Sequence, residues 1–208
     1  QNRVSIRTKY QFQMIKIGIT GGIGSGKSVV AQLLSVHGIP VYIADDESKK
    51  LTNTSPVIRE RLIHLFGPDI YTPEGLNKPA LAKAIFGNKD LLLQVNQIIH
   101  PEVNKHFLTW SEHQQQHGCA IESAILFESG FNKIVDVSLM VYAPLEIRIQ
   151  RALQRDHSTE EVLRKRIESQ VSDEEKKLWA DYIITNDGKQ PLLPQVEKFL
   201  SQIFDNIR

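Results

Sequence analysis

A glycine-rich segment near the start of the chain has the residue types and spacing needed to bind phosphate groups. Residues 21–28 read Gly-Gly-Ile-Gly-Ser-Gly-Lys-Ser, which matches the phosphate-loop pattern of two glycines five residues apart followed by Lys and Ser. Glycines let backbone N–H groups converge on phosphate oxygens, and a helix that begins there adds a partial positive charge. The residues predicted to bind the nucleotide through this backbone are Gly22, Ile23, Gly24, Ser25 and Gly26.

Lys27 and Ser28 complete the phosphate chemistry. Lys27 should reach the β and γ phosphates as a point charge, and the Ser28 hydroxyl should be a magnesium ligand. The alternative is a flexible turn with a surface lysine. The flanking patterns disfavour it, because an alternating apolar run, 15–19, precedes the loop and a helix-like stretch, 29–36, follows it. ATP and Mg²⁺ are therefore the expected cofactors.

Asp45 is the predicted catalytic base. An acceptor hydroxyl loses a proton as it attacks, so phosphoryl transfer needs a carboxylate across from the γ phosphate. Asp45 follows the apolar run Val41–Ala44, read as a strand whose carboxyl end would line the active crevice. The alternative, an acid that stabilises a helix start, fits Asp46 and Glu47 better and stays open for Asp45.

Three arginines share one predicted helical face, because Arg148, Arg151 and Arg155 are spaced i, i+3, i+7. Like charges in this arrangement repel unless an anion or acids lie between them. We expect a lid whose arginines close over phosphates and stabilise charge in the transition state. A solvated face balanced by Glu146 and Asp156 is the alternative.

Two further charged residues are candidates. Glu122 ends another strand pattern, where it could hold magnesium through water or cap a following helix, and both readings stay open. Arg166 continues the basic character beyond the arginine face and is the most plausible functional residue of the run 164–166.

Strand and helix patterns alternate along the chain, which predicts a mostly parallel α/β sheet with helices on both faces. Strand patterns cover 15–20, 41–44, 120–122, 135–143 and 182–185. Ser158 with Glu161 and Ser172 with Glu175 have capping-box spacing, marking helix starts near 160 and 173.

A long helical segment from 52 to 117 separates the second and third strand patterns. Ser55 before Pro56 opens one helix, which Gly67 closes, and 79–86 forms another. A third covers 91–99, after which Pro101 restarts the chain. So long an insert exceeds a simple crossover and predicts a lobe that receives a second substrate.

The composition limits the class of protein. The 208 residues are 41% hydrophobic and 24% charged, with a net charge of +1, which argues against a nucleic-acid partner, and no apolar stretch approaches membrane-spanning length. The single cysteine, Cys119, excludes an intrachain disulfide framework and favours a reducing cytoplasm. Residues 1–13 are expected to be a flexible tail before a fold that starts at Met14. The composition predicts no particular oligomeric state.

Together these segments resemble the dephospho-CoA kinases, which phosphorylate the ribose 3′-hydroxyl of dephospho-CoA. The resemblance extends from Met14 nearly to the end and is carried by 19–28, Ala44-Asp45, Ile99-His100-Pro101, Leu126-Phe127-Glu128, Gln150-Arg151 through Arg155-Asp156, Arg166 with Gln170, and Ala180-Asp181-Tyr182 to Asn186.

The resemblance implies a P-loop nucleotide-kinase-like core with a five-stranded parallel sheet (14–50, 119–150 and 173–208), a CoA-binding helical insert (51–118) and a small helical lid (151–172). It implies a small-molecule acceptor, dephospho-CoA, with substrate contacts from Thr20, Asp45 and His100 and a nucleotide contact from Asn186. Catalysis would rest on Lys27, Asp45, Arg151 and Arg155.

Three positions depart from the family pattern. Ile43 replaces the first aspartate of an Asp-Ala-Asp signature, which puts a second acid in doubt but leaves Asp45. Lys49 stands where arginine is common, a change that loosens bidentate phosphate contacts. Ala124 replaces a proline and should affect only backbone stiffness.

Other functions remain open on the sequence. Another small-molecule kinase, for nucleosides or nucleotides, would share the core without the His100-Pro101 segment. A GTP-dependent switch would need Asn-Lys-x-Asp, whereas Asn88–Leu91 and Asn132–Val135 both lack the final aspartate. An inactive P-loop scaffold is a third reading, disfavoured by intact Lys27, Ser28 and Asp45.

Overall fold

The computed structural model describes residues 14–156 and 158–205, so the tail predicted for 1–13 lies outside the described residues. Its centre is a five-stranded, wholly parallel sheet in the order β2-β5-β1-β6-β7. The strands are β1 (Ile15–Thr20), β2 (Val41–Ile43), β5 (Gly118–Glu122), β6 (Val137–Tyr142) and β7 (Tyr182–Thr185). The predicted five-stranded α/β fold is confirmed.

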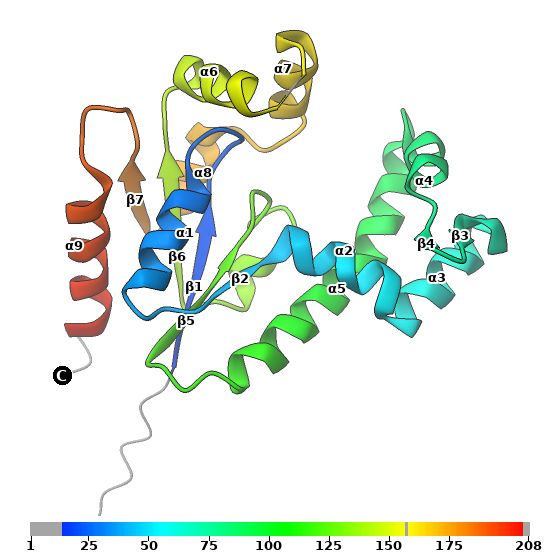
Figure 1. Cartoon of the computed structure of the whole chain (residues 1–208), viewed down its shortest axis with the longest axis horizontal. Helices are drawn as coiled ribbons and strands as arrows, with labels where there is room; N and C mark the ends of the chain where they lie inside the picture. The colour runs from blue at the N-terminus through cyan, green and yellow to red at the C-terminus, as the bar shows by residue number, and fades with distance from the viewer. Residues whose placement is uncertain (1–13, 157, 206–208) are drawn as a thin grey trace, which may run out of the picture.

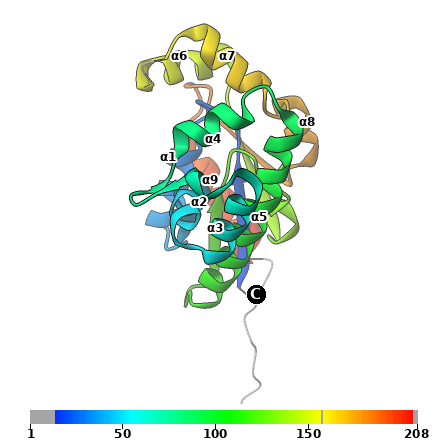
Figure 2. The same ribbon diagram turned by 90° about the vertical axis from the view of Figure 1, so that its right-hand side faces the viewer.

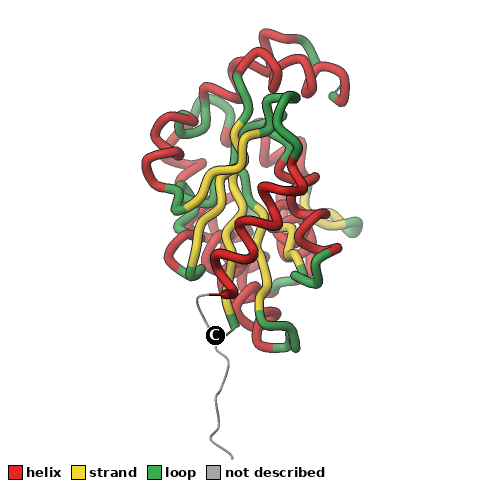
Figure 3. The backbone as a smooth tube through the Cα atoms, turned by 90° about the vertical axis from the view of Figure 1, so that its left-hand side faces the viewer, coloured by secondary structure: helices red, strands yellow, loops and turns green. Residues whose placement is uncertain are grey.

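Helices cover both faces of this sheet (Figure 3). Strand β5 shows the reason, because Ala120 packs into one apolar cluster while its neighbours Cys119 and Ile121 pack into the other. Apolar residues of α1 (Lys27–Val36) and α9 (Leu192–Asp205) belong to the first cluster, and those of α5 (Lys89–Glu112) belong to the second. Parallel strands buried on both faces in this way read as continuous apolar runs.

The helical insert has an apolar cluster of its own, centred on Ile58, Leu62 and Val95. The insert begins within α2 (Ala44–Thr54) and includes α3 (Pro56–Phe66), α4 (Lys78–Ile85), the short 3₁₀ helix η1 (Pro68–Ile70) and a two-stranded hairpin, β3 (Tyr71–Thr72) with β4 (Gly75–Leu76) (Figure 1). The predicted start of α3 is confirmed, since the Ser55 side chain accepts a hydrogen bond from the Ile58 backbone N–H at 3.3 Å. The sequence patterns had missed the hairpin.

The predicted break at Pro101 is wrong, because α5 runs unbroken through that residue. A proline inside a helix loses one backbone hydrogen bond. Packing at both ends outweighs this loss: Val95 lies in the insert cluster, whereas Val103 and Phe107 lie in the cluster beneath the sheet. Helix α5 therefore joins the insert to the core.

The segment after β6 forms α6 (Leu145–Arg155), α7 (Glu160–Glu168) and α8 (Asp173–Trp179), with α6 and α7 lying above the rest of the molecule (Figure 2). Both predicted helix starts are confirmed, and Ser172 with Glu175 forms the expected capping box. The cap of α7 is Thr159 rather than Ser158, because Thr159 directly precedes the first helical residue.

Two smaller features complete the fold. A fourth apolar cluster, built on Ile149, Ala152 and Leu163, includes Ile23 of the glycine loop and so joins α6 and α7 to that loop. A second 3₁₀ helix, η2 (Phe131–Lys133), precedes β6. Within the described part of the chain, no helix combines the length and apolarity needed to cross a bilayer.

Candidate active site

The glycine loop joins β1 to α1 and needs glycine at particular positions. Gly24 and Gly26 have positive φ values of 78° and 95°, which side chains other than glycine rarely adopt. There is also no room for a side chain: a methyl group on Gly26 would overlap Nδ2 of Asn186, and one on Gly24 would overlap the carbonyl oxygen of Arg148. The loop backbone is therefore packed directly against neighbouring elements.

A cavity of about 390 Å³ opens beside this loop. Its walls come from the loop, the start of α2, the end of β5 and the lid helices, and the lining residues are Ile23, Gly24, Lys27, Ser28, Ile43, Asp45, Asp46, Lys49, Glu122, Ala124, Arg155, Arg166, Ser169 and Gln170. Cations and carboxylates thus meet at a glycine loop, as phosphoryl transfer requires.

Lys27 and Glu122 face each other in this cavity. Lys27 Nζ lies 3.9 Å from Glu122 Oε1, and each side chain is only 12% exposed. Burial lowers the pKa of Lys27, while Glu122 and then Asp45 act in the opposite direction. Burial likewise raises the pKa of Glu122, against the influence of Lys27. Each charge of this ion pair therefore partly neutralises the other.

Asp45 lines the cavity, but the prediction that it ends a strand is wrong. Strand β2 stops at Ile43, and Asp45 lies in the first turn of α2 with Asp46 and Glu47. Three acids at a helix amino end interact favourably with its partial positive charge, which explains why the helix starts so early. The side chain of Asp45 is exposed to the cavity.

The arginines predicted to share one face have three different environments. Arg148 is buried and ion-paired with Asp173. Arg151 donates to Asn186, from Nη1 to the backbone oxygen at 3.0 Å and from Nη2 to Oδ1 at 3.4 Å. Arg155 alone of the three lines the cavity, and its Nε donates to Asp156 at 2.8 Å.

Asn186 connects Arg151 to the glycine loop. Its Nδ2 donates to the backbone oxygen of Ser25 at 2.8 Å, and its backbone N–H donates to Tyr142 at 2.7 Å. The carboxyl end of β7 is therefore held against the loop. Arg166, from α7, also lines the cavity, with Nη1 3.8 Å from Asp156 Oδ2.

Thr20 and His100 lie outside the lining of this cavity. The buried Thr20 hydroxyl donates to the backbone oxygen of Ala124 at 3.5 Å, and Ala124 itself lines the cavity. The His100 ring packs edge-on against Phe131 with centroids 5.9 Å apart, and burial lowers the pKa of His100.

Ser28 and Glu122, the predicted magnesium ligands, both line the cavity. No α-helix begins in the described segment 123–130, so Glu122 does not cap one.

Sequence reasoning missed Lys176, whose side chain is fully buried. Its Nζ lies 2.9 Å from Glu128 Oε1 and donates to the backbone oxygen of Ala124 at 2.7 Å. Glu128 Oε1 also accepts from the Val171 backbone N–H at 3.1 Å. The only sequence signal was Glu128 in the Leu-Phe-Glu segment. Glu128 therefore holds the chain at the point where it passes from the lid, at Val171, back to the core, at Lys176.

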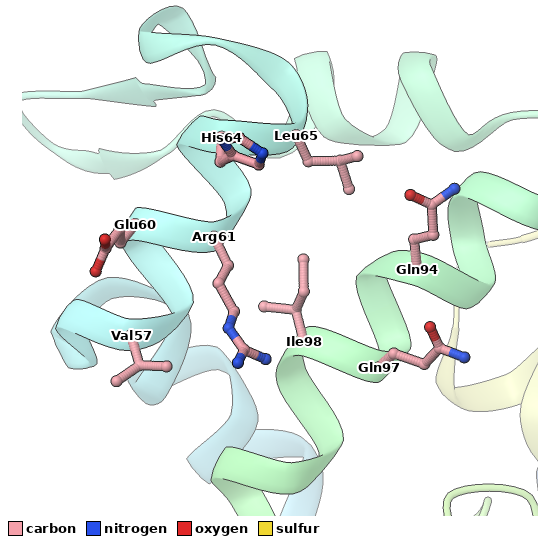
Figure 4. Close-up of a pocket in the computed structure, with 8 residues that line it drawn as sticks. All are labelled: Val57, Glu60, Arg61, His64, Leu65, Gln94, Gln97 and Ile98. Atoms are coloured by element: carbon pink, nitrogen blue, oxygen red, sulfur yellow. The ribbon is translucent and has the colours of Figure 1, made fainter.

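A second cavity, of about 660 Å³, lies in the insert with α3 and α5 as opposite walls (Figure 4). It is lined by Val57, Glu60, Arg61, His64, Leu65, Gln94, Gln97 and Ile98. Although larger, it shares no lining residue with the cavity at the glycine loop and has no phosphate-binding backbone. Phosphoryl chemistry therefore belongs to the smaller cavity.

Comparison with known proteins agrees with this geometry. A family model described as dephospho-CoA kinase matches residues 15–191. A dephospho-CoA kinase of Bacteroides fragilis is 51% identical over 194 residues, covering 93% of this chain and 95% of that protein. A solved structure from Thermus thermophilus is 31% identical, with a TM-score of 0.78 and coverage of 94% of this chain and 99% of that one.

A dephospho-CoA kinase structure from Campylobacter jejuni is 22% identical, covers 93% of this chain and 98% of its own, and has a TM-score of 0.65. This likeness shows the fold. The family model and the Bacteroides relative show more, since each covers most of the sequence. The chain is a member of the dephospho-CoA kinase family.

Proposed function

We propose that the cavity at the glycine loop is where this kinase transfers the γ-phosphoryl group of ATP to the ribose 3′-hydroxyl of dephospho-CoA, giving CoA and ADP. The observation that carries the proposal is the meeting of Lys27, Asp45, Glu122, Arg155 and Arg166 in one cavity beside that loop. The reaction is the last step of CoA biosynthesis. Rival acceptors such as nucleosides are not favoured by the family to which the chain belongs.

In this proposal the ATP phosphates lie on the backbone of 22–26, with Lys27 as their main cation. Lys27 is held by burial and by Glu122, so its ammonium group is already directed into the cavity. Arg155 approaches from the lid and would stabilise charge on the transferred group. Arg151 acts through Asn186, which holds the Ser25 backbone.

Asp45 accepts the proton of the acceptor hydroxyl. It is exposed to the cavity at the start of α2, the helix that leads from the core into the insert. A carboxylate there can reach an acceptor that enters between core and insert. Roles for Thr20 and His100 in substrate binding are further proposals; Thr20 is linked to the cavity through Ala124, which lines it, and His100 packs against Phe131.

The residues present suit a magnesium ion bound with the nucleotide. Ser28 and Glu122 offer a hydroxyl and a carboxylate to the same cavity, and Mg²⁺ prefers such oxygen ligands. No cluster of three or more His, Cys, Asp or Glu ligands occurs among the described residues. Mg²⁺ is usually held by one or two protein groups together with substrate phosphates. The bound ion would neutralise phosphate charge.

The acceptor is proposed to bind between the core and the helical insert, 51–118, with 151–172 acting as lid.

Placement in a reducing cytoplasm is a further proposal, supported by Cys119, which is the single cysteine of the chain. Its thiol is buried, and burial raises its pKa to about 11, so it is a poor thiolate nucleophile.

The direct test is ADP release coupled to an optical assay, with ATP and Mg²⁺ and purified dephospho-CoA as acceptor. Adenosine, AMP and shikimate serve as matched alternative acceptors. We expect turnover with dephospho-CoA and less than about 1% of that rate with the others, because a site specific for one substrate rejects analogues by 10²-fold or more. Equal turnover with another acceptor would refute the assignment.

A further inference from the structure

Arg148 occupies an unusual position, just before the predicted lid, 151–172. It is a charged residue on α6 whose side chain is only 3% exposed, and its Nε has no hydrogen-bond partner among the described residues. Its Nη1 is ion-paired with Asp173, the first residue of α8. One ion pair therefore joins the first and last helices of the segment that follows β6.

This ion pair rests on the glycine loop. A methyl group built on Gly22 would overlap Nη1 and Cζ of Arg148 and would lie 3.0 Å from Asp173 Oδ1. The Arg148 backbone also lies close to Gly24, where its carbonyl oxygen occupies the space that a side chain would need. Arg148 therefore meets the loop at two points, Gly22 and Gly24, beside the apolar contact that α6 makes with Ile23.

Stability alone does not account for such a pair. Removing two charges from water is costly, and apolar residues of similar volume often stabilise a fold as well or better. A buried ion pair does specify geometry, because its two groups must meet in one arrangement. Here the geometry is the spacing between the starts of α6 and α8, which bracket Arg155 and Arg166.

We propose that the Arg148–Asp173 ion pair is a positioning device that sets the glycine loop against the lid and so places the ATP phosphates for transfer. Arg148 is a positioning residue, since it does not line the cavity. The inference rests on the proposed function, in that the loop is taken to bind ATP.

The test uses Arg148→Gln, Asp173→Asn and the double variant in the full chain. Affinity for a non-hydrolysable ATP analogue with Mg²⁺ is measured without acceptor, and kcat and both KM values follow with dephospho-CoA. We expect each single variant to weaken analogue binding and lower kcat by about tenfold, with the KM for dephospho-CoA within about twofold of wild type. The double variant should be no worse than the poorer single one, because both act on one contact.

Lys165→Gln is the matched control, since it removes a lid cation whose ion pair with Glu161 is exposed, at 71% and 77%. It should change every parameter by less than about twofold. Additive losses in the double variant, or a lower Tm with unchanged analogue affinity and kcat, would overturn the proposal. If Arg148→Gln fails to fold, Asp173→Asn decides, because Asp173 is partly exposed. If the wild-type protein binds the ATP analogue but does not phosphorylate dephospho-CoA, the proposed function is refuted. The positioning role of the Arg148–Asp173 pair is then still tested by analogue affinity.

Discussion

At the residue scale, the site depends on charges that are buried with few partners. Lys27 and Glu122 lie 3.9 Å apart with little exposure, and the two shift each other's pKa in the direction that favours both charged forms. Burial acts against both. Lys27 must be protonated to attract phosphates, and Glu122 favours this protonated form by raising the pKa of Lys27.

The first prediction concerns Glu122→Gln. Burial lowers the pKa of Lys27 and Glu122 raises it, so loss of the carboxylate should lower that pKa further. A group that must be protonated loses activity as pH rises through its pKa. The alkaline limb of the profile of kcat/KM for ATP should therefore move to lower pH.

The matched control for this change is Glu174→Gln, which removes an exposed carboxylate paired with Lys177 at 2.9 Å. Its pH profile should coincide with that of wild type. An alkaline limb that stays in place, or moves to higher pH, in Glu122→Gln would show that Glu122 does not sustain the charge of Lys27.

At the element scale, α5 determines how the insert is attached. It carries Val95 in the insert cluster and Phe107 in the cluster beneath the sheet. The Phe107 ring is fully buried, edge-on to Tyr42 with centroids 5.4 Å apart and stacked on Trp110 at 5.9 Å. The carboxyl-terminal part of the helix is thus fixed by aromatic packing.

Phe107→Ala should therefore lower the free energy of unfolding by about 3–5 kcal/mol, because it removes a large buried side chain and leaves a cavity. Urea unfolding followed by circular dichroism measures this change. Lys105→Ala, exposed on the same helix, should stay within about 0.5 kcal/mol of wild type. Equal effects of the two substitutions would contradict the proposed attachment through α5.

The elements that the sequence predicted well are those with short-range signals. The strand before the loop, the glycines, the Ser55 cap and the Ser172–Glu175 box each depend on neighbours within a few residues. The error at Pro101 depends on contacts distant in sequence. Helix α5 passes Pro101 because of packing at both ends, and no local pattern shows this.

The candidate site follows the same division. Lys27 and Ser28 were predicted from the motif, Asp45 and Glu122 from strand-end position, and Arg155 from helical spacing. The structure brings all of them to one cavity. The burial of Arg148 and of Lys176 could not be predicted, since their partners lie 25 and 48 residues away, in Asp173 and Glu128. On the sequence pattern Lys176 reads as an ordinary charge on a helix surface, whereas Arg148 reads as one of three arginines that share a lid face.

At the scale of the whole molecule, the cavity is assembled from parts of the chain that are distant in sequence. The loop and β5 belong to the core, α2 leads into the insert, and Arg155 and Arg166 come from the lid (Figure 1). The core supplies phosphate-binding backbone, and the start of α2 supplies the proposed base. Movement of either attached part relative to the core would change the distance between base and phosphate.

The measurement that tests this account most directly is the comparison of Asp45→Asn with wild type. Turnover with dephospho-CoA and affinity for an ATP analogue are determined on the same preparations, with Asp69→Asn, exposed in η1 of the insert, as control. We predict that kcat falls by 10²-fold or more while analogue affinity changes by less than about threefold, because general bases typically contribute 10²–10⁴-fold. Unchanged turnover in Asp45→Asn would remove Asp45 from the mechanism and contradict the account.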